Sequence, residues 1–302
     1  MKPSLLILAA GMGSRYGGLK QFDGLGPNKE TILDYSVYDA IKGGFGKVVF
    51  VVRKSFRKEM EELTRKKYGS LVDLDYVEQE LDKIPEGYEL DPARIKPWGT
   101  AHAMLMAKYA IKEPFAVINA DDYYGRNSFR ILGNFLSSCA NSEGKYSMIG
   151  FYLNKTLSES GSVSRGICTT DENDFLTSVE EHLDIAERKG IITGTGMNGK
   201  NHPLEGNAYT SMNMWGFTPD IFRFTESIFK DFLKENGHEP KKEFYIPYVV
   251  NILINKNMAN VKILATPDRW FGVTYKEDRP MVVAKFRELA DKGIYPSPLF
   301  HD

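Results

Sequence analysis

Cysteine is scarce in this chain, which has only two cysteines, Cys139 and Cys168, among its 302 residues. Two cysteines without metal-ligand spacing exclude a disulfide framework and a structural zinc site. Neither lies in a pattern typical of a catalytic thiol. We therefore expect a protein of the reducing cytoplasm.

Long hydrophobic runs and an excess of charge are also missing. The apolar stretch at residues 5–10 is too short for the core of a signal peptide, and no stretch approaches the roughly 18 apolar residues of a membrane span. Lysine plus arginine (39) nearly balance aspartate plus glutamate (40), so no net field favours nucleic acid or an anionic membrane. A small-molecule partner is expected, and the oligomeric state is left open.

Strand and helix patterns alternate along the first 120 residues of a chain whose composition is that of a globular protein. The strands are expected at residues 5–10, 47–52, 74–77 and 115–119, and the helices at 31–41, 55–68 and 100–110. This βαβ alternation predicts an α/β fold with parallel strands, whose ligand lies at the carboxyl ends of the strands.

The second half of the chain is less regular. Strands are expected at residues 146–153, 175–181 and 212–217, and helices at 219–235, 246–255 and 281–292, the last as an outer closing helix. Residues 190–207 are rich in glycine and polar side chains, a composition typical of a mobile loop. Such a loop either covers a site or is disordered, and both readings stay open.

A glycine-rich turn with two cations follows the first strand. Gly11 and Gly13 let main-chain N–H groups approach an anion closely. The forked guanidinium of Arg15 suits two phosphate oxygens, and Lys20 is a mobile point charge. The turn therefore indicates a polyphosphate site, with a plain strand-to-helix connection as the simpler alternative.

Two better-known phosphate loops fit this turn badly. A dinucleotide fingerprint needs a third glycine where Tyr16 stands, and an acid where Arg53 follows the second strand. A P-loop needs Gly-Lys-Ser/Thr, whereas Leu19 follows Gly18.

Polar residues also follow the third and fourth strands. Gln79 comes after one, and Asp121 and Asp122 come after the other, so all three are expected at the ligand edge. Adjacent side chains on an extended backbone point apart, and we expect Asp121 to face the ligand and bind magnesium opposite the two cations. The alternative is that the aspartates only organise the turn into Tyr123.

A helix start at residues 98–103 carries small residues that let a flat ligand approach the backbone. Thr100 is placed either to cap the helix or to bind the ligand. His102 is expected to be a helix-surface or packing residue.

Taken together, these motifs resemble those of the sugar-phosphate nucleotidyltransferases, the nucleoside-diphosphate-sugar pyrophosphorylases, and the resemblance spans residues 1–280. The opening signature is carried by Leu8, Ala9, Ala10, Gly11, Met12, Gly13, Ser14, Arg15 and Lys20. The resemblance implies a Rossmann-like, mostly parallel mixed sheet flanked by helices. It also implies one domain, with a nucleotide-binding half at about 1–130 and an acceptor-binding half at about 131–280, followed by a helix and tail at 281–302.

The resemblance further implies a magnesium-dependent reaction between a nucleoside triphosphate and a sugar 1-phosphate or similar phosphorylated alcohol. Pyrophosphate is released and a nucleoside-diphosphate sugar forms. The catalytic residues would be Arg15 and Lys20, and the nucleotide-binding residues Leu8, Ala9, Ala10, Gly11, Gly13, Ser14, Arg15, Gln79, Gly99, Thr100 and Ala101. The acceptor-binding residues would be Glu181, His182 and Asn213, and the metal ligands Asp121 and Asp122.

Three positions depart from the family pattern. Leu19 replaces a proline, His182 replaces a lysine, and Gly272 stands where a second metal-binding aspartate is expected. Asp121 would then hold the metal with water, or with Asp122 or Asp268.

The alternative function is a degenerate relative that binds or senses a nucleotide or sugar nucleotide without turnover. The nucleobase and the acceptor are not determined by the sequence.

Overall fold

Four parallel strands form the half of the sheet built by the N-terminal part of the chain, in the order β4-β1-β2-β3. They are β1 (Ser4–Leu8), β2 (Lys47–Val52), β3 (Asp73–Glu78) and β4 (Phe115–Asn119). The computed structural model describes residues 1–11, 24–139, 142–158, 161–273 and 276–300. Because β1, β2 and β4 are almost wholly apolar, they are buried on both faces, as expected of parallel strands with helices on either side.

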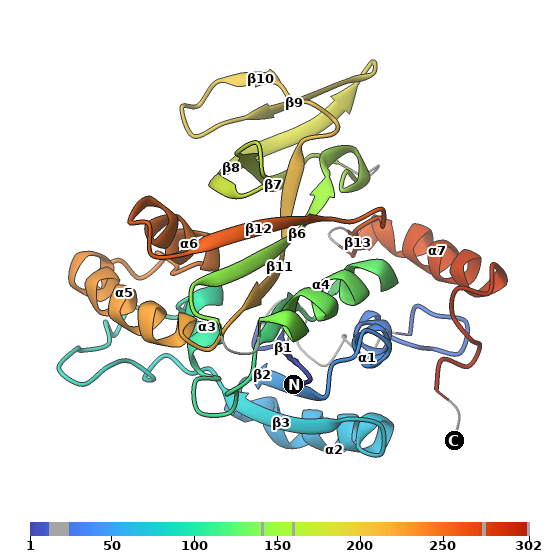
Figure 1. Ribbon diagram of the computed structural model, residues 1–302, viewed down its shortest axis with the longest axis horizontal. Coiled ribbons are helices and arrows are strands. Elements are labelled where there is room, and N and C mark those ends of the chain that lie inside the picture. Colours follow the sequence, from blue (N-terminus) through green and yellow to red (C-terminus); the bar gives the residue numbers. More distant parts are fainter. Residues whose placement is uncertain (12–23, 140–141, 159–160, 274–275, 301–302) are drawn as a thin grey trace.

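An antiparallel extension continues this sheet beyond β4. Strand β11 (Tyr209–Phe217) pairs antiparallel with β4, with β6 (Lys145–Tyr152) and with β7 (Val163–Thr170), and β12 (Asn260–Ala265) runs parallel to β6. Strands β8 (Leu176–Arg188), β9 (Ile191–Thr195) and β10 (Asn201–Pro203) extend the sheet from β7, at the top of Figure 1. The predicted Rossmann-like mixed sheet is confirmed.

Helices cover both faces of the sheet and close two apolar cores. One core packs α1 (Ile32–Lys42), α2 (Arg57–Tyr68) and α4 (Arg126–Ser138) on one face, and the other packs α3 (Thr100–Leu105), α5 (Ile221–Asn236) and α6 (Ile246–Asn255) on the opposite face. Alternate residues of β1 point to opposite cores, Leu5 and Ile7 to the first and Leu6 to the second. Each core combines residues from both halves of the chain.

The predicted closing helix is present as α7 (Arg279–Asp291), at the right of Figure 1. Its Phe286 stacks on Tyr35 of α1 with ring centroids 4.1 Å apart. The small pair β5 (Asp122–Tyr123) and β13 (Phe271–Gly272) lies beside this contact, where Tyr123 stacks on Phe271. Short 3₁₀ turns occupy Lys54–Phe56, Leu153–Lys155 and Lys276–Asp278.

The prediction of a loop at residues 190–207 is wrong, because this segment contains β9 and β10 and completes a β-sheet extension with β8. Gly190 and Gly199 have positive φ angles of 78° and 72° and make the turns. Ile192 joins a small core with Ile185, and Leu204 packs against it. A few apolar side chains therefore hold strands whose average composition resembles a loop.

Helix α4 is not among the predicted elements, although residues 129–136 carry apolar side chains at helical spacing, and its N-terminal cap comes from a remote residue. Asp268 Oδ2 accepts hydrogen bonds from the backbone N–H groups of Asn127 (2.7 Å) and Ser128 (3.2 Å). No capping residue precedes the helix locally, since Gly125 stands at that position. Helix α3 also ends earlier than predicted, at Leu105, and hydrogen-bonded turns follow. Within the described ranges, no helix has the length and apolar content required to cross a membrane.

A buried carboxyl anchors the C-terminal segment to α1. The hydroxyl of Tyr295 donates a hydrogen bond to Asp39 Oδ2 at 2.5 Å, and the Tyr123 and Tyr295 hydroxyls lie 2.8 Å apart. Burial raises the pKa of Asp39 to about 8, while the hydrogen bond from Tyr295 opposes the rise. Asp39 is therefore protonated in the folded protein at neutral pH.

This shift predicts that the free energy of unfolding decreases as the pH rises from about 4 to about 8. In that window the unfolded chain releases the Asp39 proton and the folded chain keeps it. The free energy of unfolding therefore falls by up to about 1.4 kcal/mol per pH unit. Asp39→Asn removes the Asp39 contribution and leaves that of Asp122, whose pKa burial also raises, and urea unfolding at several pH values measures the change in slope. Tyr295→Phe is the control, since it should extend the window to higher pH. An unchanged slope in Asp39→Asn would refute the assignment.

Candidate active site

The carboxyl ends of the parallel strands meet at one edge, as predicted, and the backbone ladder continues past each strand. The amide of Ala9 donates to Val51 O (2.9 Å) and the amide of Gln79 donates to Val52 O (2.9 Å). The amide of Ala120 reaches Leu8 O at 3.3 Å. These bonds hold the residues after β1, β3 and β4 in register with one another.

A hollow of about 750 Å³ opens at this edge. It is lined by Ala10 and by residues that follow β2 and β3, namely Arg53, Lys54, Ser55, Phe56, Glu80, Leu81, Asp82 and Leu90. Arg53 forms an ion pair with Glu80 at 3.5 Å. Of the opening signature, Leu8 ends β1 and Ala9, Ala10 and Gly11 follow it. The predicted residues Gly13, Ser14, Arg15 and Lys20 lie outside the described residues.

The side chain of Gln79 is held by two contacts. Its Nε2 lies 3.0 Å from Gly99 O and 3.2 Å from His102 Nδ1. His102 is completely buried, and its Nε2 lies 2.7 Å from Lys83 O. Of the two alternatives for His102, the packing one is therefore correct, and its contact with Gln79 had no signal in the sequence.

The segment Gly99 to Ala101 docks against the start of α6. Gly99 has φ +109°, and a Cβ there would lie 2.6 Å from Phe244 O, so only glycine fits. The amide of Ala101 donates to Phe244 O at 3.0 Å. Thr100 Oγ1 accepts from the amide of Ile246, the first residue of α6, at 3.1 Å. Thr100 thus serves as a cap, but of a different helix from the one expected.

The two adjacent aspartates after β4 have different surroundings. Asp121 is exposed, whereas Asp122 turns inward and its Oδ2 accepts from Asn119 Nδ2 (2.8 Å) and the Tyr124 hydroxyl (3.2 Å). Burial, followed by the nearby Asp121 carboxylate, raises the pKa of Asp122 to about 7. The two side chains therefore point in different directions, as expected of adjacent residues: Asp121 faces solvent and Asp122 is hydrogen-bonded inside the turn.

The position of Gly272 bears on metal binding. Gly272 pairs with Asp122 across β5 and β13, and a Cβ at Gly272 would lie 3.1 Å from Asp122 Oδ1. The residue that the resemblance relates to a second metal aspartate therefore adjoins the aspartate pair. Asp268 does not fit that role, because both its oxygens accept hydrogen bonds at the start of α4.

Magnesium fits this donor set only with help from a ligand. In the described part of the chain, no group of three or more His, Cys, Asp or Glu side chains is arranged to hold a metal. Magnesium usually binds through one or two carboxylates together with substrate phosphates. Asp121 and Asp122 meet that requirement, and the mutual repulsion that raises the Asp122 pKa is what a cation would relieve.

Asn213 belongs to the same hydrogen-bond network as Asp122. Its backbone is left-handed, with φ +61°. Its Nδ2 donates to Asn119 Oδ1 at 2.7 Å, and its Oδ1 accepts from Trp215 Nε1 at 3.0 Å. The chain Trp215–Asn213–Asn119–Asp122 thus links β11 to the end of β4. Asn213 therefore supports the carboxylate through Asn119, and its acceptor-binding role stays a prediction of the resemblance.

Glu181 and His182 are neighbours on β8 with different exposure. Glu181 is exposed, while His182 is buried beside His202, with ring centroids 5.2 Å apart. Desolvation raises the pKa of Glu181, and the positive charges of Arg165 and His182 oppose the rise. No hydrogen bond between described residues joins either side chain to the Asp122 network.

Arg165 is a site residue that the sequence analysis missed. Its guanidinium lies 4.6 Å from the centre of the Trp270 ring and donates to Thr156 O at 2.5 Å. Its charge opposes the rise in the pKa of both Asp122 and Glu181, so its guanidinium lies near both carboxyl groups. A single arginine inside a strand pattern gives no local signal, because Trp270 is remote in sequence.

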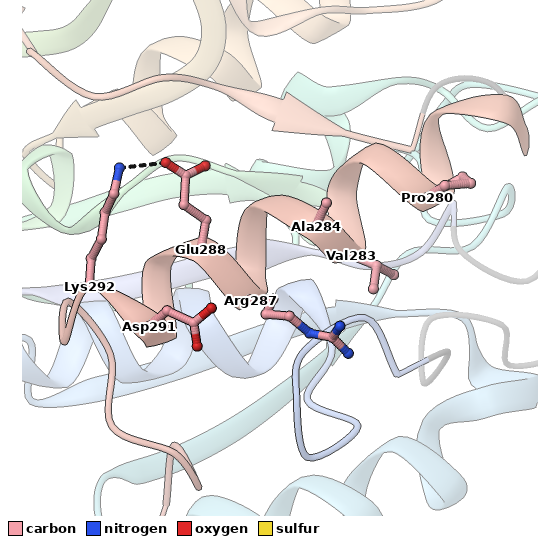
Figure 2. Close-up of a pocket in the computed structure, with 7 residues that line it drawn as sticks. All are labelled: Pro280, Val283, Ala284, Arg287, Glu288, Asp291 and Lys292. Carbon is pink, nitrogen blue, oxygen red and sulfur yellow. Dashed lines mark hydrogen bonds and ion pairs between the residues drawn. The ribbon is translucent and has the colours of Figure 1, made fainter.

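A second hollow, of about 530 Å³, lies on the outer surface of α7. Figure 2 shows that its lining comes from one helix, with an ion pair between Glu288 and Lys292. Its lining shares no residue with the hollow at the carboxyl edge.

Residues 5–225 match the model of a protein family described as nucleotidyl transferase. No curated protein matches the chain. An inositol-1-phosphate CTP transferase from T. maritima has a similar structure, with TM-score 0.61, 13% identity, and coverage of 95% of this chain and 97% of that one. A putative glucose-1-phosphate thymidylyltransferase from Bacillus anthracis has TM-score 0.60 and 14% identity, with coverage of 94% of this chain and 95% of that one. A UDP-glucose pyrophosphorylase has TM-score 0.56 and 14% identity, with coverage of 95% of this chain and 99% of that one. At these identities the structures show a shared fold.

The Asn213 contacts predict a measurable loss of stability. Asn213→Gly keeps the left-handed backbone but leaves the buried Trp215 Nε1 without its acceptor, which typically costs about 1–3 kcal/mol. Asn213→Ala should cost about 1 kcal/mol more, because alanine is strained at this φ. Urea unfolding of both variants measures the two effects. Wild-type stability in both would contradict the network.

Proposed function

The chain belongs to the nucleotidyl transferase family, a family of transferase enzymes, and from this we propose that it couples a nucleoside triphosphate to a sugar 1-phosphate or similar phosphorylated alcohol, with release of pyrophosphate. The solved relatives named above act, by their names, on glucose 1-phosphate, inositol 1-phosphate and UDP-glucose. Their low identity to this chain leaves the acceptor open among these phosphates.

The observation that carries the proposal is the position of the aspartate pair. Asp121 and Asp122 follow β4 at the same edge where β1 ends and Ala9, Ala10 and Gly11 follow it. Asp122 is also tied through Asn119 to Asn213 on β11, the strand that joins the two parts of the sheet. A nucleotide bound over the parallel strands and an acceptor bound over the antiparallel part would therefore meet beside these carboxylates.

In the proposed reaction, a phosphate oxygen of the acceptor attacks the α-phosphorus of the triphosphate. A new P–O bond forms, the bond to the bridging oxygen breaks, and pyrophosphate leaves with that electron pair. No protein nucleophile is needed, so the chain contributes by positioning two anions and neutralising their repulsion. Arg15 and Lys20 are proposed to contact the phosphates.

The aspartates and Arg165 set the charge around this reaction. Asp121 and Asp122 would hold magnesium, which when bound neutralises negative charge on the phosphates. The neighbouring Arg165 favours the ionised form of Asp122. Gly272 is buried against this pair, and a Cβ there would lie 3.1 Å from Asp122 Oδ1, so the glycine lets β13 pack closely beside Asp122.

A relative that binds nucleotide without turnover is the second candidate, and the absence of a carboxylate at position 272 favours it. The two candidates differ in one observable. The enzyme releases pyrophosphate from a triphosphate in the presence of an acceptor phosphate, whereas the binding protein is only stabilised by the nucleotide.

A measurement of pyrophosphate release tests turnover directly. Each nucleoside triphosphate is mixed with glucose 1-phosphate, an amino-sugar 1-phosphate or inositol 1-phosphate, and pyrophosphate release is measured. We expect release with one pairing, and a fall of about 100-fold or more in kcat for Lys20→Ala, since losing such a transition-state contact costs about 2.7–4 kcal/mol. Unchanged turnover in that variant would remove Lys20 from catalysis. Thermal stabilisation by a triphosphate without any release would favour the binding protein.

Substitutions at position 272 test whether this position adjoins a metal site. Gly272→Asp places a third carboxylate beside Asp121 and Asp122, so the melting temperature without magnesium should fall. Magnesium should then raise the melting temperature of this variant by about 2 °C or more beyond its effect on the wild type. Gly272→Asn is the matched control, with nearly the same size and no charge. An equal response of the two variants to magnesium would show that this position does not adjoin a metal site.

A further inference from the structure

The connection between β3 and α3 is long and contains no helix or strand. We call residues 79–99 the wall segment, because four of them, Glu80, Leu81, Asp82 and Leu90, line the hollow at the carboxyl edge. Connections longer than about 12–15 residues without secondary structure are uncommon in compact domains, and the ordered ones usually have a function. The contacts that hold the wall segment in place therefore determine the shape of the hollow.

Arg94 fastens the wall segment to the second half of the chain. Only 3% of its surface is exposed. Its Nη1 donates to Glu239 O at 3.1 Å, and its Nη2 donates to Lys242 O at 2.6 Å and to Pro97 O at 3.3 Å. Two of these three carbonyl groups belong to the connection between α5 and α6. Burying a charged group is costly unless hydrogen bonds compensate for it, so these contacts favour a single position of Arg94.

Trp98 carries this contact to the edge of the hollow. The guanidinium carbon of Arg94 lies 3.5 Å from the centre of the Trp98 ring. The indole Nε1 of Trp98 donates to Leu81 O at 2.9 Å, and Leu81 lines the hollow. Neither Arg94 nor Trp98 is among the described residues of the lining. Arg94 can therefore act on the hollow only through other residues, along the chain Arg94–Trp98–Leu81.

Two further contacts between the wall segment and the second half of the chain lie nearer to solvent. The hydroxyl of Tyr88 donates to Lys230 O of α5 at 3.0 Å, where the segment runs below α5 in Figure 1. Lys96 forms an ion pair with Glu243, and half of the Lys96 side chain is exposed. Ion pairs at the surface contribute little to stability. Of these three attachments Arg94 is the buried one, so its loss should loosen the wall segment most.

We propose that Arg94 is a positioning residue for the substrate triphosphate, because it holds the wall segment in the shape that the hollow beside Ala10 needs to bind the nucleotide. This inference rests on the proposed function, which places the nucleotide over the parallel strands. A wall that is ordered before the ligand arrives does not have to be ordered during binding, and the affinity is higher by that free energy. Arg94 therefore affects binding of the triphosphate and not the transfer step.

Two substitutions of Arg94 test this role. Arg94→Met keeps an unbranched apolar stem and removes all three hydrogen bonds to carbonyl groups. The dissociation constant of the best-bound triphosphate among UTP, TTP, GTP, CTP and ATP should rise about tenfold or more, and KM with it. The kcat for pyrophosphate release should stay within about twofold of the wild type, because the phosphate contacts are untouched. Arg94→Lys keeps the charge without the planar fork and should give an intermediate rise.

A purely structural role of Arg94 gives a different result. It would lower the melting temperature of Arg94→Met and leave the dissociation constant and KM of the folded protein unchanged. Tyr76→Phe is the control for stability, since it removes a buried hydroxyl contact of 2.6 Å with Thr64 between β3 and α2, and neither residue lines the hollow. This control should lower the melting temperature without weakening triphosphate binding. Equal weakening in Tyr76→Phe and Arg94→Met would overturn the role of Arg94.

The inference and the proposed function fail in different ways. Pyrophosphate release by the wild type, together with an unchanged dissociation constant in Arg94→Met, overturns the role of Arg94 alone, and so does a fall in kcat at unchanged KM. Absence of both triphosphate binding and pyrophosphate release in the wild type overturns both.

Circular dichroism checks the fold of each variant. If Arg94→Met does not fold, Trp98→Phe breaks the same chain of contacts at Leu81 O and keeps an aromatic ring beside the guanidinium. It should weaken triphosphate binding in the same way, and an unchanged dissociation constant there would refute the proposal.

Discussion

The parallel pairing of β1 between β4 and β2 is the constraint on which the site depends. It puts the ends of four strands at one edge, and the bonds from Ala9, Gln79 and Ala120 carry the ladder past those ends. The chain therefore leaves each strand at a defined position. Residues more than a hundred positions apart in sequence can face one ligand only because this register is rigid.

Buried polar side chains connect this edge to the rest of the molecule. The network from Trp215 to Asp122 crosses from β11 to β4, and His102 joins Gln79 to the segment around Lys83. Leaving a buried polar group unpaired is costly, so each of these contacts favours a single arrangement of the site. The ionisable members respond to burial in opposite directions, since the pKa of Asp122 rises and that of His102 falls.

Most of the first half of the fold could be predicted because its signals are local. The apolar runs of β1, β2 and β4 and the capping box of Thr31 at the start of α1 lie within short segments. Helix α4 was missed although residues 129–136 carry apolar side chains at helical spacing; only its cap, Asp268, comes from the other end of the chain. The β9–β10 region was misread because a few apolar contacts outweighed a polar, glycine-rich average composition.

The sequence by itself determined the family, the α/β class and the residue types available to bind phosphate, because glycine spacing, apolar periodicity and adjacent carboxylates are properties of short segments. Only the tertiary structure decided what several of those residues do. Thr100 caps α6, Asn213 supports Asn119, Asp268 caps α4, and His102 contacts Gln79. Each of these roles depends on a partner that is remote in sequence, and remote partners meet only when the sheet has formed.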